Sequence, residues 1–331
     1  MALPQQHTIS EDEAALYDRQ IRLWGAEAQL RMRNASILIA GMRGLSNEVC
    51  KNIILAGVGS ITILDHENIT EQDFGSQFLI RGAALGTNRA AAAAEKARLL
   101  NPRVNVIVDQ EDIVKKDDAF FQQFNIVCLV GCTIDQMIRV DDACRASEKR
   151  TGFYAANVYG FNGYIFCDLK DHHYRVERQE ENAATVIIQK HHTYDSLSDV
   201  LLARFGFPTP RKLRRKVSPL LLAIQVLWQF QQQHGGRLPQ SSSQEDLATM
   251  LQLRDTKLKD AQVDPAFVDD SLIQVLVSTG SAEIMPVCAV VGGYLAQDIL
   301  KTLSAKDAPI LNHYIYSGME ATGVVHHIKK E

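Results

Sequence analysis

The sequence predicts an α/β fold, a doubly wound and mostly parallel sheet carrying an inserted, mainly helical module. Three observations favour this fold class. A short apolar strand, a helix and a second β-branched strand follow one another within residues 35–65. Strands and helices go on alternating to about residue 150, as in sheets built from βαβ units. From about residue 177 to residue 278 the pattern becomes mainly helical and polar.

The unit at residues 35–65 is the element around which the chain is organised. Ser36–Ala40 is continuously apolar and is expected to be a buried parallel strand. Leu45–Ala56 has its apolar residues at helical spacing, and Gly57–Gly59 ends this helix. Ser60–Leu64 is the second strand, and Asp65 lies at its tip. Rossmann-like folds hold a nucleotide with this arrangement.

The turn that opens the helix departs from the G-x-G-x-x-G pattern of dinucleotide sites. It reads Gly41-Met42-Arg43-Gly44-Leu45-Ser46, so Arg43 and Ser46 have side chains where a glycine would let backbone approach a phosphate. Either Arg43 pairs with a phosphate, or the scaffold no longer binds nucleotide. We favour the second interpretation, because a bulky residue in the turn shortens the anion-binding nest at the helix N-terminus.

The first domain is expected to span residues 1–176. Its N-terminal segment is amphipathic, with a capping box at Ser10 and Glu13 and an apolar face made of Leu16, Ile21, Leu23, Trp24, Leu30 and Met32. The later elements are predicted as a helix at 86–100, a strand at 104–108, a helix at 117–124, a strand at 126–130, a helix at 135–146 and strands at 153–158 and 164–168.

An inserted helical module is predicted at residues 177–278, and residues 279–331 return to the first domain. Within the module the sequence predicts weak, short strands between residues 175 and 215 and helices at 197–204, 219–233, 244–253 and 265–277. The basic run Arg211–Lys216 precedes the second of these helices. The returning segment is predicted as a buried helix at 284–303, in which Gly292 and Gly293 allow close packing, and a hairpin at 313–316 and 324–328. The basic run is a solvated helix face, a nuclear localisation signal or, least favoured, a nucleic-acid patch.

Composition sets limits on function. The formal net charge of −4 gives no strong field for nucleic acid or membranes, and the N-terminus does not resemble a secretory signal. No C-x-x-C pair occurs among the six cysteines Cys50, Cys128, Cys132, Cys144, Cys167 and Cys288, which predicts reduced core thiols and no metal site. Cys288 could be a nucleophile at a helix start, but a small buried thiol is the commoner case. The histidine doublets at 172–173, 191–192 and 326–327 lack the i,i+4 spacing of helical metal ligands.

Several motifs in order resemble the ubiquitin-like-protein activating enzymes, specifically the small, Aos-type subunits of SUMO-activating enzymes. They are Tyr17-Asp18-Arg19-Gln20-Ile21-Arg22-Leu23-Trp24-Gly25, the turn Gly41–Gly44, Leu64-Asp65-His66-Glu67, Gln77-Phe78-Leu79-Ile80-Arg81, Asn101-Pro102, the stretch Met285–Lys301 and Gly318-Met319. The resemblance covers residues 10–170 and 270–328 well and the module between them weakly. It implies a ThiF/MoeB-type adenylation fold.

In that family two related adenylation domains pair, and one of them keeps the ATP site, the zinc-binding cysteines and the catalytic cysteine. This chain departs from the active pattern at the glycine turn, at Asp65-His66-Glu67 and at the Asn-x-x-Arg expected before Gln77. The resemblance therefore implies the non-catalytic half, with ATP, Mg and zinc held by a large partner subunit in an obligate heterodimer. It also implies SUMO as a further partner, the SUMO-conjugating enzyme through the complex, and a location in the nucleus and cytoplasm.

Arg19 is the residue that the resemblance assigns to the chemistry. The matching arm of the family reaches across the dimer to the phosphates of the partner's ATP, and a guanidinium supplied in this way stabilises charge on the α-phosphate. Three alternatives stay open: the regulatory half of the NEDD8-activating enzyme, an NAD-dependent Rossmann oxidoreductase, and a scaffold with no catalytic residue. The short insertion favours the SUMO branch, and the missing glycines argue against the oxidoreductase.

Overall fold

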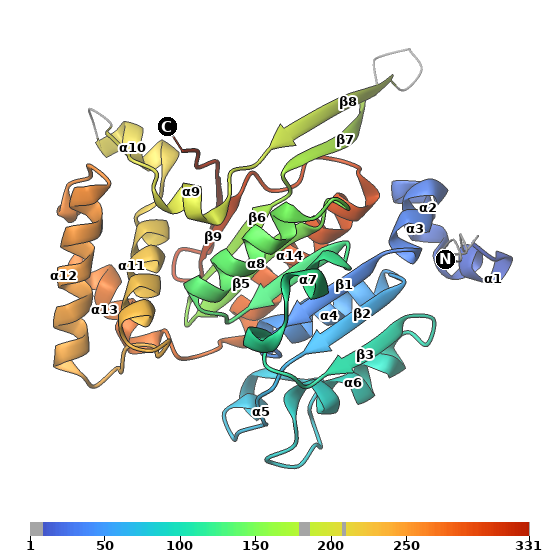
Figure 1. Ribbon diagram of the computed structural model, residues 1–331, viewed down its shortest axis with the longest axis horizontal. Coiled ribbons are helices and arrows are strands. Elements are labelled where there is room, and N and C mark those ends of the chain that lie inside the picture. Colours follow the sequence, from blue (N-terminus) through green and yellow to red (C-terminus); the bar gives the residue numbers. More distant parts are fainter. Residues whose placement is uncertain (1–8, 179–185, 207–209, 331) are drawn as a thin grey trace.

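The computed structural model describes residues 9–178, 186–206 and 210–330. Within these residues the main sheet has eight strands in the order β10-β9-β6-β5-β4-β1-β2-β3 (Figure 1). In chain order the strands are β1 (Ser36–Ala40), β2 (Ser60–Leu64), β3 (Asn105–Asp109), β4 (Ile126–Val130), β5 (Gly152–Tyr159), β6 (Asn162–Asp168), β9 (His313–Ser317) and β10 (Thr322–His326). Their bounds follow the predicted strands closely.

The sheet joins a parallel half to an antiparallel half. Strands β3, β2, β1, β4 and β5 pair in parallel, whereas β5 with β6, β6 with β9 and β9 with β10 pair antiparallel. The chain runs outward from β1 to β3 and then returns to the other side of β1 at β4. This reversal creates a topological switch point between β1 and β4, where α/β sheets bind ligands. The predicted fold class is confirmed.

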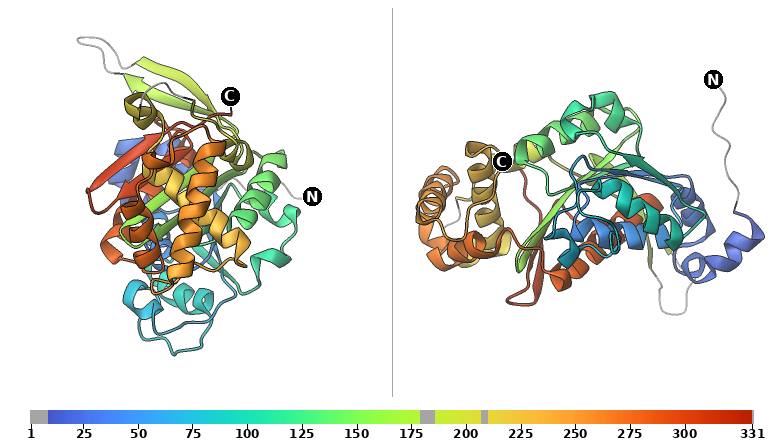
Figure 2. Two further views of the ribbon diagram at one scale, coloured as in Figure 1. Left: turned by 90° about the vertical axis from the view of Figure 1, so that its left-hand side faces the viewer. Right: turned by 90° about the horizontal axis from the view of Figure 1, so that it is seen from below.

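Helices cover both faces of the sheet (Figure 2). One face packs against α3 (Ala26–Arg33), α4 (Gly44–Leu55), α6 (Arg89–Leu100) and α14 (Met285–Ser304), and the other against α7 (Asp118–Gln122), α8 (Ile134–Ala146) and α11 (Pro219–Gln233). Each face has its own hydrophobic core, and successive strand residues point to opposite faces. Ile37 and Ile39 of β1 therefore pack in the core beneath α4 and α14, and Leu38 packs in the core beneath α8 and α11. The strands of the parallel half are therefore apolar on both sides.

Helix α14 packs closely on α4 through Gly292. A Cβ atom at this position would lie 2.7 Å from Cβ of Glu48 and 3.2 Å from the carbonyl oxygen of Leu45. Gly293 has nothing within 4 Å of a Cβ position, so it faces open space. The prediction of close packing is therefore correct for Gly292 and wrong for Gly293.

The inserted region adds α9 (Leu197–Leu201), α10 (Pro210–Lys216), α12 (Gln244–Asp260) and α13 (Asp270–Thr279) around α11. Helix α11 is buried on nearly all sides, and the ring of its Trp228 packs edge-on against Tyr164 of β6 with centroids 5.0 Å apart. Helix α12 continues past Leu253, the predicted end, because Leu258 is fully buried and Arg254 donates to the carbonyl of Val268 at 3.0 Å. Residues 265–267 form a separate 3₁₀ turn rather than the start of α13.

A two-stranded ribbon stands apart from the main sheet (Figure 1). Its strands β7 (Asp171–Arg178) and β8 (Val186–Thr193) have eight residues each, where the sequence predicts only weak, short strands. Ion pairs hold it to the body, since Arg175 lies 2.8 Å from Glu27 and Lys306 lies 3.1 Å from Glu177. The doublets His172–His173 and His191–His192 face each other across the ribbon, as strand residues.

The N-terminal arm consists of α1 (Glu11–Leu16) and α2 (Asp18–Trp24), which lead into α3. The predicted capping box is confirmed, because Ser10 and Glu13 exchange side-chain and backbone hydrogen bonds of 3.2 Å. The predicted apolar face is only partly correct. Leu16 and Leu23 are 60% and 62% exposed, and Tyr17 is instead the buried anchor of the arm.

Candidate functional site

A pocket of about 260 Å³ opens at the switch point, where β1, β2 and β4 end. It is lined by Ala40, Gly41, Arg43, Leu64, Asp65, His66, Glu67, Ile113, Val130, Gly131, Cys132, Thr133, Gln136, Gly235 and Gly236. Gly41 has a φ of +89°, and a Cβ there would lie 2.0 Å from the carbonyl oxygen of Val130. Only glycine fits this turn. The pocket is smaller than the roughly 300–1,000 Å³ of most ligand sites.

Arg43 crosses this pocket. A Cβ atom at Gly131 would lie 2.6 Å from Nε of Arg43 and 2.8 Å from its Cδ, so the arginine side chain passes directly over that glycine. Its guanidinium ends 3.7 Å from a carboxylate oxygen of Glu67. The side chain that replaces the second glycine of the motif is thus paired with an acid of this chain.

A carboxylate lies at the N-terminus of α4. Glu283, just before α14, accepts a hydrogen bond from the backbone N–H of Gly44 at 3.1 Å and one from the hydroxyl of Ser76 at 2.8 Å. Gly44 is the first residue of α4. Helix N-termini attract anions, and in dinucleotide sites the pyrophosphate lies there. Here an acid of the protein itself uses that position.

The other candidate residues of the turn bond to the turn itself. Asp65 accepts a hydrogen bond from the N–H of Met42 at 2.6 Å and from that of Glu67 at 2.8 Å, and burial raises the pKa of this carboxyl group. The hydroxyl of Ser46 donates to the carbonyl of Gly41. Asp65 therefore braces the turn rather than facing open solvent.

Beside the pocket lies a buried polar chain that the sequence analysis missed. Arg89, at the start of α6, pairs with Glu67 and with Asp73 at 3.0 Å; Asp73 begins the short helix α5 (Asp73–Ser76). Asp73 accepts from the amide of Gln77 at 2.7 Å, and Gln77 accepts from Asn47 of α4 at 3.3 Å. Asp73 and Gln77 are four residues apart, but Asn47, Glu67 and Arg89 come from distant parts of the chain, and no local pattern signals their contact with this pair.

The residues at the switch point leave little room for the phosphates of a nucleotide. Arg43 covers Gly131, Glu283 engages the N-terminus of α4, and the remaining volume is small. A bound phosphate would have to displace the carboxylate of Glu283 from a donor that it already satisfies.

Arg19 lies elsewhere, on the exposed side of α2. Its guanidinium makes no hydrogen bond or ion pair with any residue of the described part of the chain. The neighbouring Arg22, in contrast, forms an ion pair, since its Nε lies 2.9 Å from the carboxylate of Asp18. Arg19 borders a hollow of about 460 Å³ whose other walls include Leu23 and Leu55.

Helix α4 separates Arg19 from Arg43. The hollow beside Arg19 is lined by Asn52, Leu55 and Ala56, at the C-terminal end of α4, whereas Arg43 immediately precedes its first residue. A helix of this length spans about 18 Å. The arm therefore presents its free arginine away from the switch-point pocket of its own chain.

The cysteines are free thiols, and all except Cys132 are buried. Loss of solvent around the buried Cys288 and the half-buried Cys132 raises the pKa of each thiol to about 12, which disfavours the reactive thiolate. Among residues 9–178, 186–206 and 210–330, no group of three or more His, Cys, Asp or Glu side chains is placed to hold a metal ion. Over the same residues, every helix is too short or too polar to cross a membrane.

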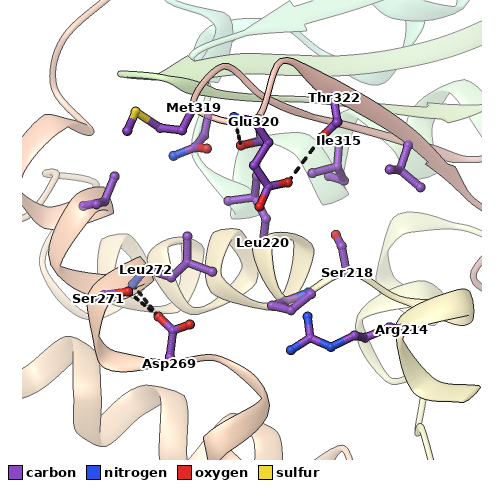
Figure 3. Close-up of a pocket in the computed structure, with 15 residues that line it drawn as sticks. Arg214, Ser218, Leu220, Asp269, Ser271, Leu272, Ile315, Met319, Glu320 and Thr322 are labelled. Atoms are coloured by element: carbon purple, nitrogen blue, oxygen red, sulfur yellow. Dashed lines mark hydrogen bonds between the residues drawn. The ribbon is translucent and has the colours of Figure 1, made fainter. Parts of the chain in front are cut away.

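A further cavity of about 410 Å³ lies between the β9–β10 hairpin and helices α11 and α13 (Figure 3). Its carboxylates have local structural partners. Asp269 accepts from the hydroxyl of Ser271 at 2.6 Å and from the N–H of Leu272 at 2.9 Å, which caps α13. Glu320 accepts from Thr322 at 3.3 Å within the hairpin. The arrangement is that of a helix cap and a turn, not of a catalytic acid–base pair.

Comparison with known proteins places these features in a family. The model of the ThiF family matches residues 17–331. Proteins described as SUMO-activating enzyme subunit 1 are similar over nearly their whole length: the rat protein is 38% identical over 96% of this chain and 95% of its own, and the human protein 37% over the same shares. The zebrafish protein is 40% identical over 96% of this chain and 95% of its own. The chain therefore belongs to the ThiF family, as a homologue of the SUMO-activating enzyme subunit 1 proteins.

Proposed function

We propose that this chain is the non-catalytic subunit of a heterodimeric SUMO-activating enzyme. The large partner subunit would hold ATP, Mg and zinc, adenylate the C-terminus of SUMO and receive it on its own cysteine. This chain would complete the partner's active site by supplying Arg19 in trans. The observation that carries the proposal is the placement on an anchored arm of an arginine without a hydrogen-bond or ion-pair partner among the described residues. This arginine lies at the far end of α4 from a switch-point pocket that Arg43 and Glu283 narrow.

An exposed apolar surface supports the pairing. Val290 and Tyr294 of α14 are 44% and 41% exposed, and Leu55 at the end of α4 is 47% exposed. Gly293, on the same side of α14, borders the hollow that Arg19 and Leu55 line. Exposed apolar patches mark protein–protein contacts, and this one adjoins Arg19. A partner seated on it would receive the guanidinium at the edge of the interface.

The chemistry of Arg19 follows from charge. Adenylation by bound ATP builds negative charge on the α-phosphate while pyrophosphate leaves. A guanidinium with a planar fork of donors stabilises such charge more in the transition state than in the ground state. Because Arg19 makes no hydrogen bond or ion pair with a described residue that would have to break, it is available for this role. Activity would then depend on correct pairing.

The experiment that tests the proposal is ATP–pyrophosphate exchange by the reconstituted pair, with assembly followed by gel filtration. Tyr294→Asp should dissociate the pair and abolish exchange, whereas Arg19→Ala should reduce exchange by roughly 100- to 1,000-fold in an intact pair. If the Arg19→Ala pair exchanges pyrophosphate at the wild-type rate, the chain is a scaffold that contributes no catalytic residue. A pair that stays intact with Tyr294→Asp would place the interface on another surface.

The purified chain alone should bind neither ATP nor NAD at micromolar concentration, because Arg43 and Glu283 obstruct the phosphate position. Fluorescence titration with each nucleotide measures this. Tight NAD binding would favour the oxidoreductase alternative, and tight ATP binding would contradict the assignment as the non-catalytic half. Co-purification from cells decides between a SUMO-activating and a NEDD8-activating partner, and imaging of the tagged chain tests the expected location in nucleus and cytoplasm.

A further inference from the structure

Four cationic residues and one histidine line a pocket of about 400 Å³ near the C-terminal end of the chain. The residues of this cationic pocket are Arg204, Lys216, His327, Lys329 and Lys330, together with Phe205 and Ile328. None of these lining residues is a carboxylate. The formal net charge of the chain is −4, so this concentration of positive charge is local.

The fold brings these cations together from three separate segments. Arg204 follows α9, Lys216 ends α10, and the irregular segment after β10 runs beside both helices to the C-terminus (Figure 1). The amide and carbonyl oxygen of Ile328 are both hydrogen-bonded to the side chain of Asn312, at 3.0 and 2.5 Å. Ile328 is also 2% exposed, so these two hydrogen bonds and its burial fix the position of the backbone from which Lys329 and Lys330 extend. Such a held backbone distinguishes the pocket from a frayed basic tail.

Helix α10 is also held in place. Leu213 and Val217 are buried, and the guanidinium of Arg214 lies 5.1 Å from the ring centre of Phe267. The basic run at residues 211–216 is therefore part of a packed helix. Its last residue, Lys216, is the member that lines the cationic pocket.

Most of this charge is not neutralised within the chain. Lys330 lies 2.6 Å from Asp199, but the side chains of Arg204, Lys216 and Lys329 make no hydrogen bond or ion pair with any described residue. Burial and the nearby charges of Lys329 and Lys216 lower the pKa of His327, and the charge of Asp195, which accepts from the N–H of Lys330 at 3.3 Å, opposes this shift. Arg204, Lys216 and Lys329 thus share one pocket without a paired carboxylate among the described residues, and an anionic ligand would relieve the repulsion between them.

We infer that the cationic pocket binds a short acidic segment of a partner protein. Carboxylates spaced along an extended peptide match cations contributed by three chain segments around a pocket of this size. Nucleic acid fits less well. Single strands bind on exposed aromatic rings, and the one aromatic residue lining the pocket, Phe205, is only 7% exposed. The net negative charge of the whole chain also disfavours a long polyanion.

The test is fluorescence anisotropy of a labelled peptide of eight alternating Glu and Asp residues, titrated with the full-length chain at low and at physiological salt. The double variant Lys216→Glu with Lys329→Glu should weaken binding at least about tenfold, because it reverses two exposed charges. Both residues are exposed, so the fold should persist, and thermal unfolding checks this. Lys115→Glu, beyond β3 at the opposite edge of the sheet, is the matched control and should leave binding unchanged.

Three outcomes would overturn the proposal. They are no measurable binding of the peptide at low salt, equal loss of binding in the control and in the double variant, and tighter binding of a single-stranded oligonucleotide of the same charge. The last outcome would make the surface a nucleic-acid site. The prediction is independent of Arg19, so pyrophosphate exchange by the pair should be the same with the double variant as with the wild-type chain.

Discussion

The amide of Asn101 donates a hydrogen bond of 2.7 Å to the hydroxyl of Tyr17 and another of 3.0 Å to the carbonyl of Ile54. Both side chains are buried, and the ring of Tyr17 rests on Gly57, where a Cβ atom would come within 2.4 Å of it. One residue after α6 thus ties the N-terminal arm to the end of α4. Tyr17 fixes the start of α2, and Arg19 lies two residues further on.

Tyr17→Phe should lower the free energy of unfolding by about 1–2 kcal/mol, because it leaves one buried N–H of Asn101 without an acceptor. Urea denaturation measures this loss. Tyr316→Phe is the control, since the hydroxyl of Tyr316 has no hydrogen-bond partner among the described residues, and it should be nearly neutral. Equal stability of both variants would mean that the Tyr17–Asn101 contact contributes nothing to anchoring the arm.

Arg19→Ala should reduce pyrophosphate exchange by the reconstituted pair by roughly 100- to 1,000-fold, the scale of losing one donor to a developing oxyanion. Assembly should change little, because an exposed charge contributes little to packing. Arg19→Lys should recover only part of the rate, since lysine lacks the planar fork of donors.

Arg22→Ala is the matched control for Arg19. It removes the next arginine of the same helix, whose guanidinium is already paired with Asp18. Exchange should stay near the wild-type rate. A large loss in Arg22→Ala combined with normal exchange in Arg19→Ala would move the role to Arg22.

Cys288→Ala should destabilise the chain by only about 1 kcal/mol, the scale of a small change in a packed core. The thioester with the modifier should still form on the partner subunit, because Cys288 is buried and its pKa is raised to about 12. A gel assay for the thioester, run without reducing agent, measures this. Loss of the thioester in a pair that still assembles would give Cys288 a chemical role.

Asp298 should make the stability of the chain depend on pH. It is buried in α14, accepts from the hydroxyl of Tyr154 and the N–H of Ile310 at 2.9 Å each, and burial raises its pKa to about 6. Since the folded pKa exceeds the unfolded value, the protonated form stabilises the fold below about pH 4. This contribution of about 3 kcal/mol is lost as the pH rises from about 4 to about 6.

Asp298→Asn removes the titrating proton, and Tyr154 can then donate to Thr302, whose hydroxyl lies 2.7 Å away. The difference in stability between variant and wild type should therefore shift in favour of the variant between pH 4 and pH 6. Thermal unfolding at several pH values measures the difference. A constant difference over this range would show that Asp298 does not titrate there.

Much of the fold could be predicted because its signals are local. The βαβ unit at residues 35–65, the capping box at Ser10 and the apolar helix α11 follow from periodicity and from residue types within one or two turns. The ribbon β7–β8 was predicted poorly. Strand β8 is mostly exposed on both faces and groups its apolar residues at one end, so its sequence lacks the alternation that marks a half-buried strand.

The candidate site divides in the same way. The sequence by itself determined that the turn at Gly41–Ser46 lacks the glycines of a dinucleotide site, and the resemblance of its motifs to the ubiquitin-like-protein activating enzymes assigned a role to Arg19. The tertiary structure alone decided that Glu283 meets the N–H of Gly44, 239 residues away, and that Arg43 lies over Gly131. It also decided that Arg19 and Arg43 lie at opposite ends of α4. Contacts between distant segments depend on how the helices pack on the sheet, and the preferences of neighbouring residues in the sequence do not determine that packing.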